Sequence, residues 1–445
     1  MKKLTYILCI LPMLLGCTQQ TASSPTPTVA LTNTPIPTAT QNSSPLPLAS
    51  ATSTTIPTLQ GQNTIRVPQE QPTIQDGINT AQDGYLVLVS PGVYNEQLTL
   101  SGKTITLASE FYTTGDPAYI NSTIIDGGGQ TVITVNTTVG EDTKIIGFTI
   151  QNGDDGISAL GKLHILNNRI INNKDGVDYE GGGGICRGNT FENNSDDGID
   201  LDGPSEVMIE ENLIQNNSDD GIEIRLHTYS GPTLDIFIRD NIISGNGEDG
   251  IQLIDYNDLS DRVITIEHNL ITDNTMVGLG LMDNGDTLED YRAASIPERI
   301  HLINNTFVNN PYAVTGGDNL IAINNLFVSS SSTALKEVDG GSILAYQLFW
   351  NNGEDNKGSN LDLLTTISAD PLFGLAYQLQ EGSPAIDTGT DYFEWGGEII
   401  LDLPNDAFFG TAPDLGKFES NHGTPALVPE PEARGFLPPG EVSHH

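Results

Sequence analysis

Acidic side chains recur at fixed places beside a repeated Asp-Gly-Ile pattern. Carboxylates that recur in this way can bind cations or take part in acid–base catalysis. The pattern's glycines are Gly156, Gly176, Gly198, Gly221, Gly250 and, more weakly, Gly278. Aligned on them, a first column reads Ser158, Asp178, Asp200, Glu223 and Gln252, and a second reads Leu160, Glu180, Asp202, Arg225 and Ile254. Because alternate side chains of a strand face opposite ways, we expect both columns to point away from the core into solvent.

Stacked carboxylates predict a cation site. Adjacent strands lie about 4.8 Å apart, so like charges on neighbouring strands repel and favour binding of protons or cations. Calcium takes about six to eight oxygen ligands in flexible geometry. The predicted ligands are Asp178, Glu180, Asp200, Asp202 and Glu223. The alternative is an acidic face that is simply solvated.

Two reactions fit these columns. In an elimination, a cation neutralises a uronate carboxylate and a basic residue removes the neighbouring proton. Arg225 and Lys174 are the candidate bases, although an arginine base needs an unusually lowered pKa. In an inverting hydrolysis, two carboxyl groups stand about 6.5–9.5 Å apart. The candidates for that role are Asp197, Asp220 and Asp200.

A further acidic column precedes the repeated glycines and has a structural explanation. This turn column consists of Asp155, Asp175, Asp197, Asp220 and Asp249. Aspartate before glycine makes turns, with its side chain accepting hydrogen bonds from the backbone. We favour that interpretation, since the residue recurs in every repeat. Beside it runs a rim column of Asp154, Lys174, Asp196, Asp219 and Glu248.

Longer connections follow three successive repeats and predict a wall along one edge. They span residues 226–235, 255–262 and 283–298. Tyrosine rings stack on pyranose faces and polar groups bind hydroxyls. The predicted substrate-binding residues are His227, Tyr229, Tyr256 and Arg262. The alternative is a set of solvated loops.

The elements that must position these residues are short strands. A repeat of 20–29 residues with β-branched runs and asparagine at the turns is typical of a parallel β-helix. The turn residues are Gly147, Asn168, Asn189, Asn212, Asn241, Asn269, Asn305 and Asn325. We assign the asparagines a structural role, bonding to one another and to turn backbone. Tandem hairpins are the rival topology, but the turns lack hairpin spacing.

The body is predicted to open with a strand at Ile65–Pro68 and a helix over Pro72–Ala81 that is expected to cap the first turn of the solenoid. Strands are predicted at Tyr85–Val89 and Thr104–Ala108.

Two segments resemble the pectin lyase-like superfamily. The opening carries Pro72-Thr73-Ile74-Gln75 and Pro91-Gly92-Val93-Tyr94-Asn95-Glu96; the closing part carries Ala369-Asp370-Pro371-Leu372-Phe373, Gly382-Ser383-Pro384-Ala385-Ile386-Asp387 and Pro413-Asp414-Leu415-Gly416. The resemblance covers residues 63–419. It implies an all-β, single-stranded right-handed parallel β-helix with a short N-terminal capping helix.

The resemblance does not select an activity, because the superfamily includes lyases, hydrolases, esterases, epimerases and non-enzymes. The Gly-His-Gly and Arg-Ile-Lys elements of polygalacturonases are missing, as are the Gln-Asp-Thr-Leu of pectin esterases, the Asp-Pro-His-Glu of mannuronan epimerases and the repeated Arg-Pro of pectate lyases. No catalytic set therefore transfers residue by residue.

The N-terminus predicts export and lipidation. Lys2 and Lys3 precede an apolar run over Leu4–Leu15, and Leu14-Leu15-Gly16-Cys17 resembles a bacterial lipobox with Cys17 as the lipidated residue. The alternative is a plain secretory signal. We predict a signal over residues 1–16, a Thr/Pro/Ser-rich stalk over 17–62 and a β-helix over 63–421. A disordered tail over 422–445 is expected to follow.

The net charge of the chain limits the partners that it can bind. The chain has 18 basic and 58 acidic residues and a net charge of −40, which repels nucleic acid. After signal removal, Cys17 and Cys186 remain, so no internal disulfide is expected within the body.

Two functions remain open. We expect a monomer anchored to the bacterial membrane, facing the periplasm or cell exterior, which is either a Ca²⁺-assisted polysaccharide lyase or hydrolase or a non-catalytic glycan-binding, adhesive solenoid. An enzyme should show a strongly perturbed carboxylate or base beside the tyrosine-bearing wall, whereas a binding solenoid should not.

Overall fold

Short runs of branched aliphatic residues form nearly all the strands, because such side chains pack well on a pleated surface with little conformational freedom to lose. The structure, a computed structural model, describes residues 62–256, 260–288 and 291–421. Three long parallel sheets, named A, B and C here, contain most of the strands in these ranges. The predicted signal, stalk and tail lie outside the described residues.

Sheet A consists of β1 (Thr64–Val67), β2 (Leu86–Val89), β5 (Thr106–Ser109), β8 (Lys144–Ile146), β11 (Lys162–Leu166), β14 (Gly183–Arg187), β17 (Glu206–Glu210), β20 (Tyr229–Arg239), β23 (Ser260–Glu267), β26 (Arg299–Ile303), β29 (Leu320–Ile323) and β32 (Ile343–Ala345). Sheet B consists of β3 (Gly92–Asn95), β6 (Thr123–Asp126), β9 (Thr149–Gln151), β12 (Arg169–Ile171), β15 (Thr190–Glu192), β18 (Leu213–Gln215), β21 (Ile242–Ser244), β24 (Leu270–Thr272), β27 (Thr306–Val308), β30 (Leu326–Val328), β33 (Leu348–Trp350) and β35 (Ile367–Ser368).

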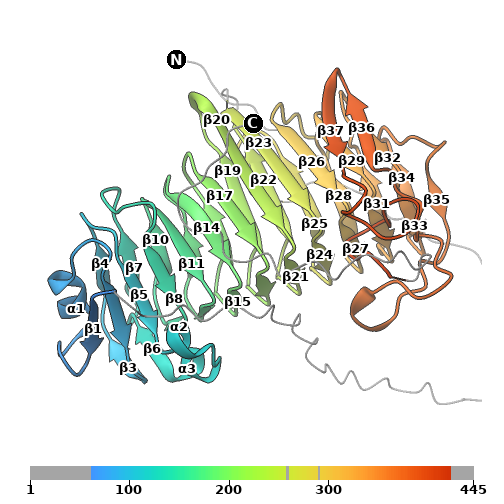
Figure 1. Cartoon of the computed structure of the whole chain (residues 1–445). Coiled ribbons are helices and arrows are strands. Elements are labelled where there is room, and N and C mark those ends of the chain that lie inside the picture. The colour runs from blue at the N-terminus through green and yellow to red at the C-terminus, as the bar shows by residue number, and fades with distance from the viewer. Residues whose placement is uncertain (1–61, 257–259, 289–290, 422–445) are drawn as a thin grey trace, which may run out of the picture. The chain divides into compact units, whose positions relative to one another are not determined.

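Sheet C consists of β4 (Leu98–Leu100), β7 (Ile133–Val135), β10 (Asp155–Ala159), β13 (Asp175–Asp178), β16 (Ile199–Leu201), β19 (Ile222–Leu226), β22 (Ile251–Asp255), β25 (Val277–Met282), β28 (Tyr312–Thr315), β31 (Thr333–Lys336) and β34 (Glu354–Lys357). The chain passes from A to B to C and returns to A beside the strand it left, so each circuit forms one rung. Figure 1 shows these strands stacked side by side along the solenoid. The predicted parallel β-helix is thereby confirmed.

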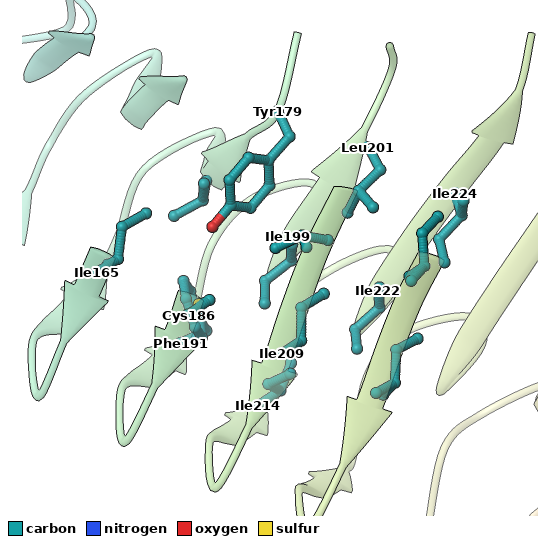
Figure 2. Packing of buried hydrophobic residues seen from close by; sticks show 14 of the residues in the cluster. Ile165, Tyr179, Cys186, Phe191, Ile199, Leu201, Ile209, Ile214, Ile222 and Ile224 are labelled. Atoms are coloured by element: carbon teal, nitrogen blue, oxygen red, sulfur yellow. The ribbon is translucent and has the colours of Figure 1, made fainter. Parts of the chain in front are cut away.

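The core is a set of aliphatic columns inside the three sheets. In Figure 2, Ile165, Cys186 and Ile209 come from successive strands of sheet A and point inward, facing Ile199 and Ile222 of sheet C. All five are fully buried. Each buried aliphatic side chain contributes about 1.5–3 kcal/mol. Packing of this kind holds the rungs together, and the one described cysteine, Cys186, is free.

Asparagine ladders fix the corners between the sheets. At the corner between A and B, Asn212 Oδ1 accepts from Asn189 N at 2.9 Å, and Asn212 in turn donates to Asn241 Oδ1 at 3.0 Å. The same pattern runs from Asn168 to Asn325, which confirms the structural role predicted for this column. A second ladder, not predicted, joins B to C through Asn173, Asn194, Asn217, Asn246, Asn274 and Asn310.

The N-terminal rung is covered by α1 (Ile74–Thr80), as predicted, although the helix is shorter than expected. The Thr73 hydroxyl accepts a hydrogen bond from the backbone of Asp76 and caps the helix. Ile74 and Ile78 are buried against the first rung. The short helices α2 (Phe111–Thr114) and α3 (Ala118–Ser122) lie in the connection between β5 and β6.

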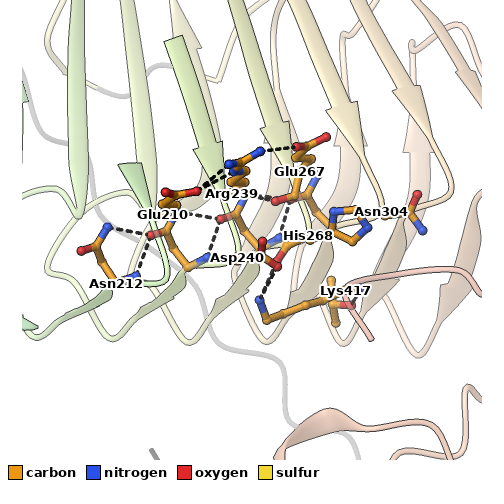
Figure 3. A network of polar contacts seen from close by, with 12 residues as sticks. Glu210, Asn212, Arg239, Asp240, Glu267, His268, Asn304 and Lys417 are labelled. Atoms are coloured by element: carbon orange, nitrogen blue, oxygen red, sulfur yellow. Dashed lines mark hydrogen bonds and ion pairs between the residues drawn. The ribbon is translucent and has the colours of Figure 1, made fainter. Parts of the chain in front are cut away.

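The closing segment folds back along the solenoid. The predicted motifs meet where Asp387 N donates to Asp414 Oδ1 at 2.8 Å and Leu415 N donates to Ala385 O. The antiparallel hairpin β36 (Tyr392–Trp395) and β37 (Glu398–Asp402) packs on sheet A, and a 3₁₀ turn spans Leu375–Tyr377. In Figure 3, Lys417 Nζ reaches His268 O at 2.6 Å, beside an alternating ladder of Glu210, Arg239 and Glu267.

Two of the three predicted loops are partly strand, which corrects the sequence interpretation. Residues 229–235 belong to β20, and residues 260–262 belong to β23, which pairs with β20. These residues are strand because β20 and β23 are longer than the neighbouring strands of sheet A and pair with each other in their first residues. None of the described helices is long and apolar enough to cross a bilayer.

Candidate functional site

The register of sheet C stacks the first predicted column as expected. Asp178 pairs with Asp200, Asp200 pairs with Glu223, and Glu223 pairs with Gln252. Since the alternate residues Ile199 and Leu201 are buried in the core, these polar side chains lie on the outer face of the sheet.

The outer face is nevertheless covered over much of its length, contrary to the prediction of solvent exposure. Asp200 is 9% exposed and Glu223 is 4% exposed, whereas Asp178 is half-buried. Neighbouring side chains of the stack and Arg225 crowd around these two carboxylates. Sequence alternation gives the direction of a side chain but not what lies above it.

Three carboxylates converge on this face. Asp178, Asp200 and Asp202, called the carboxylate cluster below, each place an oxygen within 4.8 Å of the other two. Asp178 Oδ1 and Asp200 Oδ1 are buried and have no hydrogen-bond partner among the described residues. A buried oxygen without a partner costs about 1–3 kcal/mol. The cluster therefore has unfilled capacity for a proton or a cation.

Arg225 joins this cluster to the next rung. Its Nε lies 3.0 Å from Asp202 Oδ1 and its Nη2 lies 2.6 Å from Glu223 Oε1. Burial alone lowers the pKa of Arg225, but Glu223, Asp200 and Asp202, together with a hydrogen bond to Tyr256, raise the pKa above its ordinary value. The guanidinium is firmly charged while those carboxylates are ionised.

Burial and mutual repulsion perturb the carboxylates strongly. Burial, followed by repulsion from Glu180, raises the pKa of Asp178 to about 7. Burial, followed by repulsion from Glu223 and Asp202, raises the pKa of Asp200 to about 9. For Glu223, burial raises the pKa to about 7 although Arg225 opposes the rise.

The turn column is a hydrogen-bond ladder, as the structural interpretation predicted. Asp220 N donates to Asp197 Oδ1 at 2.8 Å, and Asp249 N donates to Asp220 Oδ1 at 2.7 Å. Burial raises the pKa of both Asp197 and Asp220. An oxygen of Asp197 also lies within 4.8 Å of one of Asp200, which is closer than the spacing that inverting hydrolysis uses.

Two other predicted site residues lie beside the cluster rather than within it. Lys174 is on the rim, paired with Asp175 at 2.8 Å and Asp196 at 2.9 Å. Burial lowers the pKa of Lys174, but these two aspartates raise it by more. The pKa of Lys174 therefore lies above its ordinary range. Glu180 is exposed, accepts a hydrogen bond from Ser158, and belongs to no close group of three ligands within the described ranges.

The wall beside the cluster is aromatic. His227 and Tyr256 stack with ring centroids 4.3 Å apart, and Tyr256 touches Arg225. Tyr229 lies under the Arg262 guanidinium at 5.8 Å. Exposed His227 and half-buried Tyr256 offer ring surface beside Arg225, whereas half-buried Tyr229 lies against Arg262.

Arg262 is a correction to the predicted substrate-binding set. It is 3% exposed and donates to the carbonyls of His227 at 2.8 Å and Gly203 at 3.5 Å. Its guanidinium therefore ties the aromatic wall to the residue after Asp202 and presents little surface to a sugar.

Sequence reasoning missed a second buried acidic pair at the wall. Asp255 and Glu298 are 5% and 3% exposed, with oxygens that lack hydrogen-bond partners among the described residues. Burial, followed by repulsion from Glu298, raises the pKa of Asp255 to about 7. Asp255 ends β22 and Glu298 directly precedes β26, and no spacing in the sequence links them.

Comparisons with known proteins agree on the fold. Residues 131–292 match the family described as right handed beta helix region. A pectate lyase, Pel9A, superposes with a TM-score of 0.53 at 15% identity, covering 81% of this chain and 98% of that one. No curated protein matches the chain in sequence.

Two further solved structures have lower scores. They are the catalytic unit of a GH87 alpha-1,3-glucanase from Streptomyces thermodiastaticus (TM-score 0.46, 17% identity, 72% of this chain and 69% of that one) and the periplasmic alginate epimerase AlgG (0.40, 15%, 68% and 81%). The family description and the pectate lyase superposition agree that the solenoid is a right-handed parallel β-helix.

Proposed function

We propose that this protein is a cation-assisted polysaccharide lyase that acts on an extracellular, uronate-containing chain over the outer face of sheet C. The observation that carries the proposal is the carboxylate cluster, with two unpartnered buried oxygens, in contact with Arg225 and the aromatic wall. The likeness in fold to a pectate lyase accords with this function.

The cluster suits calcium. Its donors are carboxylate oxygens, the ligands that Ca²⁺ prefers, and the close ligand groups found among the described residues contain no histidine or cysteine. Asp178, Asp200 and Asp202 would hold the ion, with Glu180 and Glu223 beside it. A bound Ca²⁺ would neutralise the uronate carboxylate and acidify the carbon-bound proton next to it.

Arg225 is the proposed proton acceptor. Among the described basic side chains, it alone forms ion pairs with the cluster and Glu223. The carboxylates that raise the pKa of Arg225 are the predicted cation ligands. Arg225 can therefore accept a proton only once a cation bound to those carboxylates has weakened their attraction for the guanidinium. Lys174 is the weaker candidate because it is tied to the rim aspartates.

The aromatic wall is proposed to position the sugar. Tyr256 bonds to Arg225 and stacks on His227, and Tyr229 lies against Arg262. Aromatic faces of this kind stack on pyranose rings. Arg262 supports this wall from below through His227 O. Cys17, as the lipidated residue, would hold the enzyme at the membrane, facing the periplasm or the cell exterior.

Glycoside hydrolysis is the second candidate, favoured by one observation. The pKa of Asp178, about 7, suits a general acid near neutral pH. A purely adhesive solenoid is less well supported, because it has no need of carboxylates perturbed this strongly beside an aromatic wall.

The test is a panel of acidic and neutral polysaccharides incubated with the whole protein, in Ca²⁺ or in chelator. Absorbance at 235 nm reports elimination, and reducing ends report any cleavage. We expect a Ca²⁺-dependent rise in absorbance that Arg225→Ala removes. Reducing ends without absorbance would replace the lyase by a hydrolase. Glycan binding without either signal would establish the adhesive solenoid instead.

A further inference from the structure

The first outward column of sheet C continues beyond the carboxylate cluster and ends in lysines. Strand pairing carries it, one residue per rung, through Glu223, Gln252, Gly280, Thr315, Lys336 and Lys357. The residue before Lys336, Leu335, is buried in the core, so Lys336 lies on the outer face. The column is therefore acidic up to Glu223, uncharged over the next three rungs and basic in the last two.

The two lysines have no carboxylate partner among the residues that the structure describes. The lysines in ion pairs there are Lys162, Lys174 and Lys417, and neither Lys336 nor Lys357 is among them. In a chain with 58 acidic and 18 basic residues, this pair forms a locally positive place. Because adjacent strands lie about 4.8 Å apart, the two ammonium groups repel each other, and an anion bound between them would relieve the repulsion.

Two tyrosine rings hold Lys336 in place. Tyr291, from the connection over residues 283–298, and Tyr312 of β28 stack with ring centroids 4.4 Å apart. Lys336 Nζ lies 5.7 Å and 5.9 Å from the two centroids and donates a hydrogen bond to Tyr291 O. Both rings are half-buried, so each keeps some surface open to solvent. A fixed cation beside aromatic surface suits a sugar that carries a negative group.

We infer that Lys336, Lys357, Tyr291 and Tyr312 form an anion subsite for an acidic glycan. The lysines bind a carboxylate or sulfate group of the glycan, and the tyrosines contact its sugar ring. Exposed Lys357, on β34, the last strand of sheet C, is the member most open to the ligand. The inference rests on the proposed function, because it assigns the same face of sheet C to the same polymer, but the subsite binds without a cation.

The subsite stands well apart from the carboxylate cluster. Lys336 is five rungs from Asp200, about 24 Å at the usual strand spacing. Only a glycan long enough to span this distance meets both places at once. The subsite therefore favours long chains over short oligosaccharides, which reach one place or the other.

Four substitutions separate the charge of the subsite from its fold. Lys357→Gln removes one charge from an exposed side chain, and Lys357→Arg keeps that charge. Lys336→Gln removes the second charge, and Lys357→Gln carries the test alone should Lys336→Gln fail to fold. Lys144→Gln, on β8 of sheet A, is the matched control because it removes the same charge from another face.

The experiment measures binding of the whole protein to polygalacturonate, dextran sulfate and neutral dextran by calorimetry, in chelator and at low ionic strength. Chelator removes any cation-dependent binding at the carboxylate cluster. We expect an acidic glycan to bind and dextran not to bind. Lys357→Gln and Lys336→Gln should each weaken that binding by about 2–5-fold. Lys357→Arg and Lys144→Gln should bind as the wild type does, and added salt should weaken binding in every variant.

The two acidic glycans identify the group that is bound. Stronger binding of polygalacturonate assigns the subsite to a carboxylate, and stronger binding of dextran sulfate assigns it to a sulfate ester. If the wild type cleaves polygalacturonate in Ca²⁺, Lys357→Gln should raise the KM for long chains, leave the KM for short oligosaccharides unchanged and leave kcat unchanged.

The remaining outcomes decide between the subsite and the proposed function. No binding of acidic glycans in chelator, or binding that Lys357→Gln and Lys336→Gln leave unchanged, overturns the subsite; the Ca²⁺-dependent cleavage assay still decides the proposed function. Lysine-dependent binding by a protein that cleaves no glycan supports the subsite and overturns the lyase.

Discussion

At the scale of single residues, the site depends on carboxylates that the fold forces together. Asp178 and Asp200 lie on adjacent strands, where β-pairing fixes the spacing of side chains regardless of their charge. Burial, followed by repulsion from neighbouring carboxylates, raises the pKa of Asp200 to about 9. A bound cation would compensate for this repulsion, which is the basis for proposing one.

The two candidate bases should behave differently when removed. Arg225 contacts the cluster, whereas Lys174 pairs with the rim. We expect Arg225→Ala to lower the turnover number by about 10²–10⁴-fold and Lys174→Ala to leave it near the wild-type value. Initial rates of absorbance change at 235 nm measure both. The reverse ranking would identify Lys174, on the rim, as the base.

The raised pKa values predict how stability depends on pH. An acid whose pKa is higher in the folded than in the unfolded chain favours folding most below its unfolded pKa, and this advantage is lost as pH rises through the folded pKa. For Asp178, Glu223 and Asp200 that window runs from the ordinary acid range to about 7, 7 and 9.

In chelator, the unfolding temperature should therefore fall between pH 5 and pH 9, and Ca²⁺ should restore it mainly at the upper end. Asp200→Asn should flatten the fall, since it removes the most perturbed acid. Calorimetric scans across this range are the measurement. A metal-free protein that gains stability toward pH 9 would contradict the assignment.

At the scale of elements, the asparagine ladders set the corners that bring the columns into register. Asn212 accepts from Asn189 N and donates to Asn241 Oδ1 and Cys186 O, all buried. Removing the amide leaves several of these groups unsatisfied, each at about 1–3 kcal/mol.

We expect Asn212→Ala to lower the free energy of unfolding by about 2–5 kcal/mol in total, as measured by urea denaturation. Asn121→Ala, at an exposed position of α3, is the control and should change it by less than about 0.5 kcal/mol. Equal effects at the two positions would remove the ladder from this explanation.

Sequence patterns predicted the strands and their register better than they predicted the contacts of the candidate site. The spacing of the Asp-Gly-Ile repeats was enough to place Asp178, Asp200 and Glu223 in one column, because parallel pairing carries a repeat directly into register. It could not show that Glu223 is covered, that β20 and β23 extend into the wall, or that Asp255 meets Glu298. Those facts depend on connections of unequal length, whose paths no local pattern determines.

At the scale of the whole molecule, the proposed site lies on the outer face of sheet C. The closing segment lies on sheet A and at the corner between A and B, where Lys417 contacts His268 O. The closing segment and the proposed binding site therefore lie on different faces of the solenoid.

The proposed membrane anchor is tested by a single substitution. Cys17→Ser removes the sulfur that would receive the lipid. We expect the wild-type chain in the membrane fraction of the producing bacterium and Cys17→Ser in the soluble exported fraction, with sheet C activity unchanged. Immunoblotting after fractionation measures this. A wild-type chain found only in the soluble fraction would favour the plain secretory signal.

The most direct test of the central claim is diffraction from crystals of the protein grown with Ca²⁺ and soaked with an acidic oligosaccharide. The account predicts anomalous density for an ion bonded to Asp178, Asp200 and Asp202 at about 2.3–2.6 Å. A sugar carboxylate should reach this ion, with a ring of the oligosaccharide against Tyr256 or His227. An oligosaccharide bound on another face, with no ion at the carboxylate cluster, would contradict it.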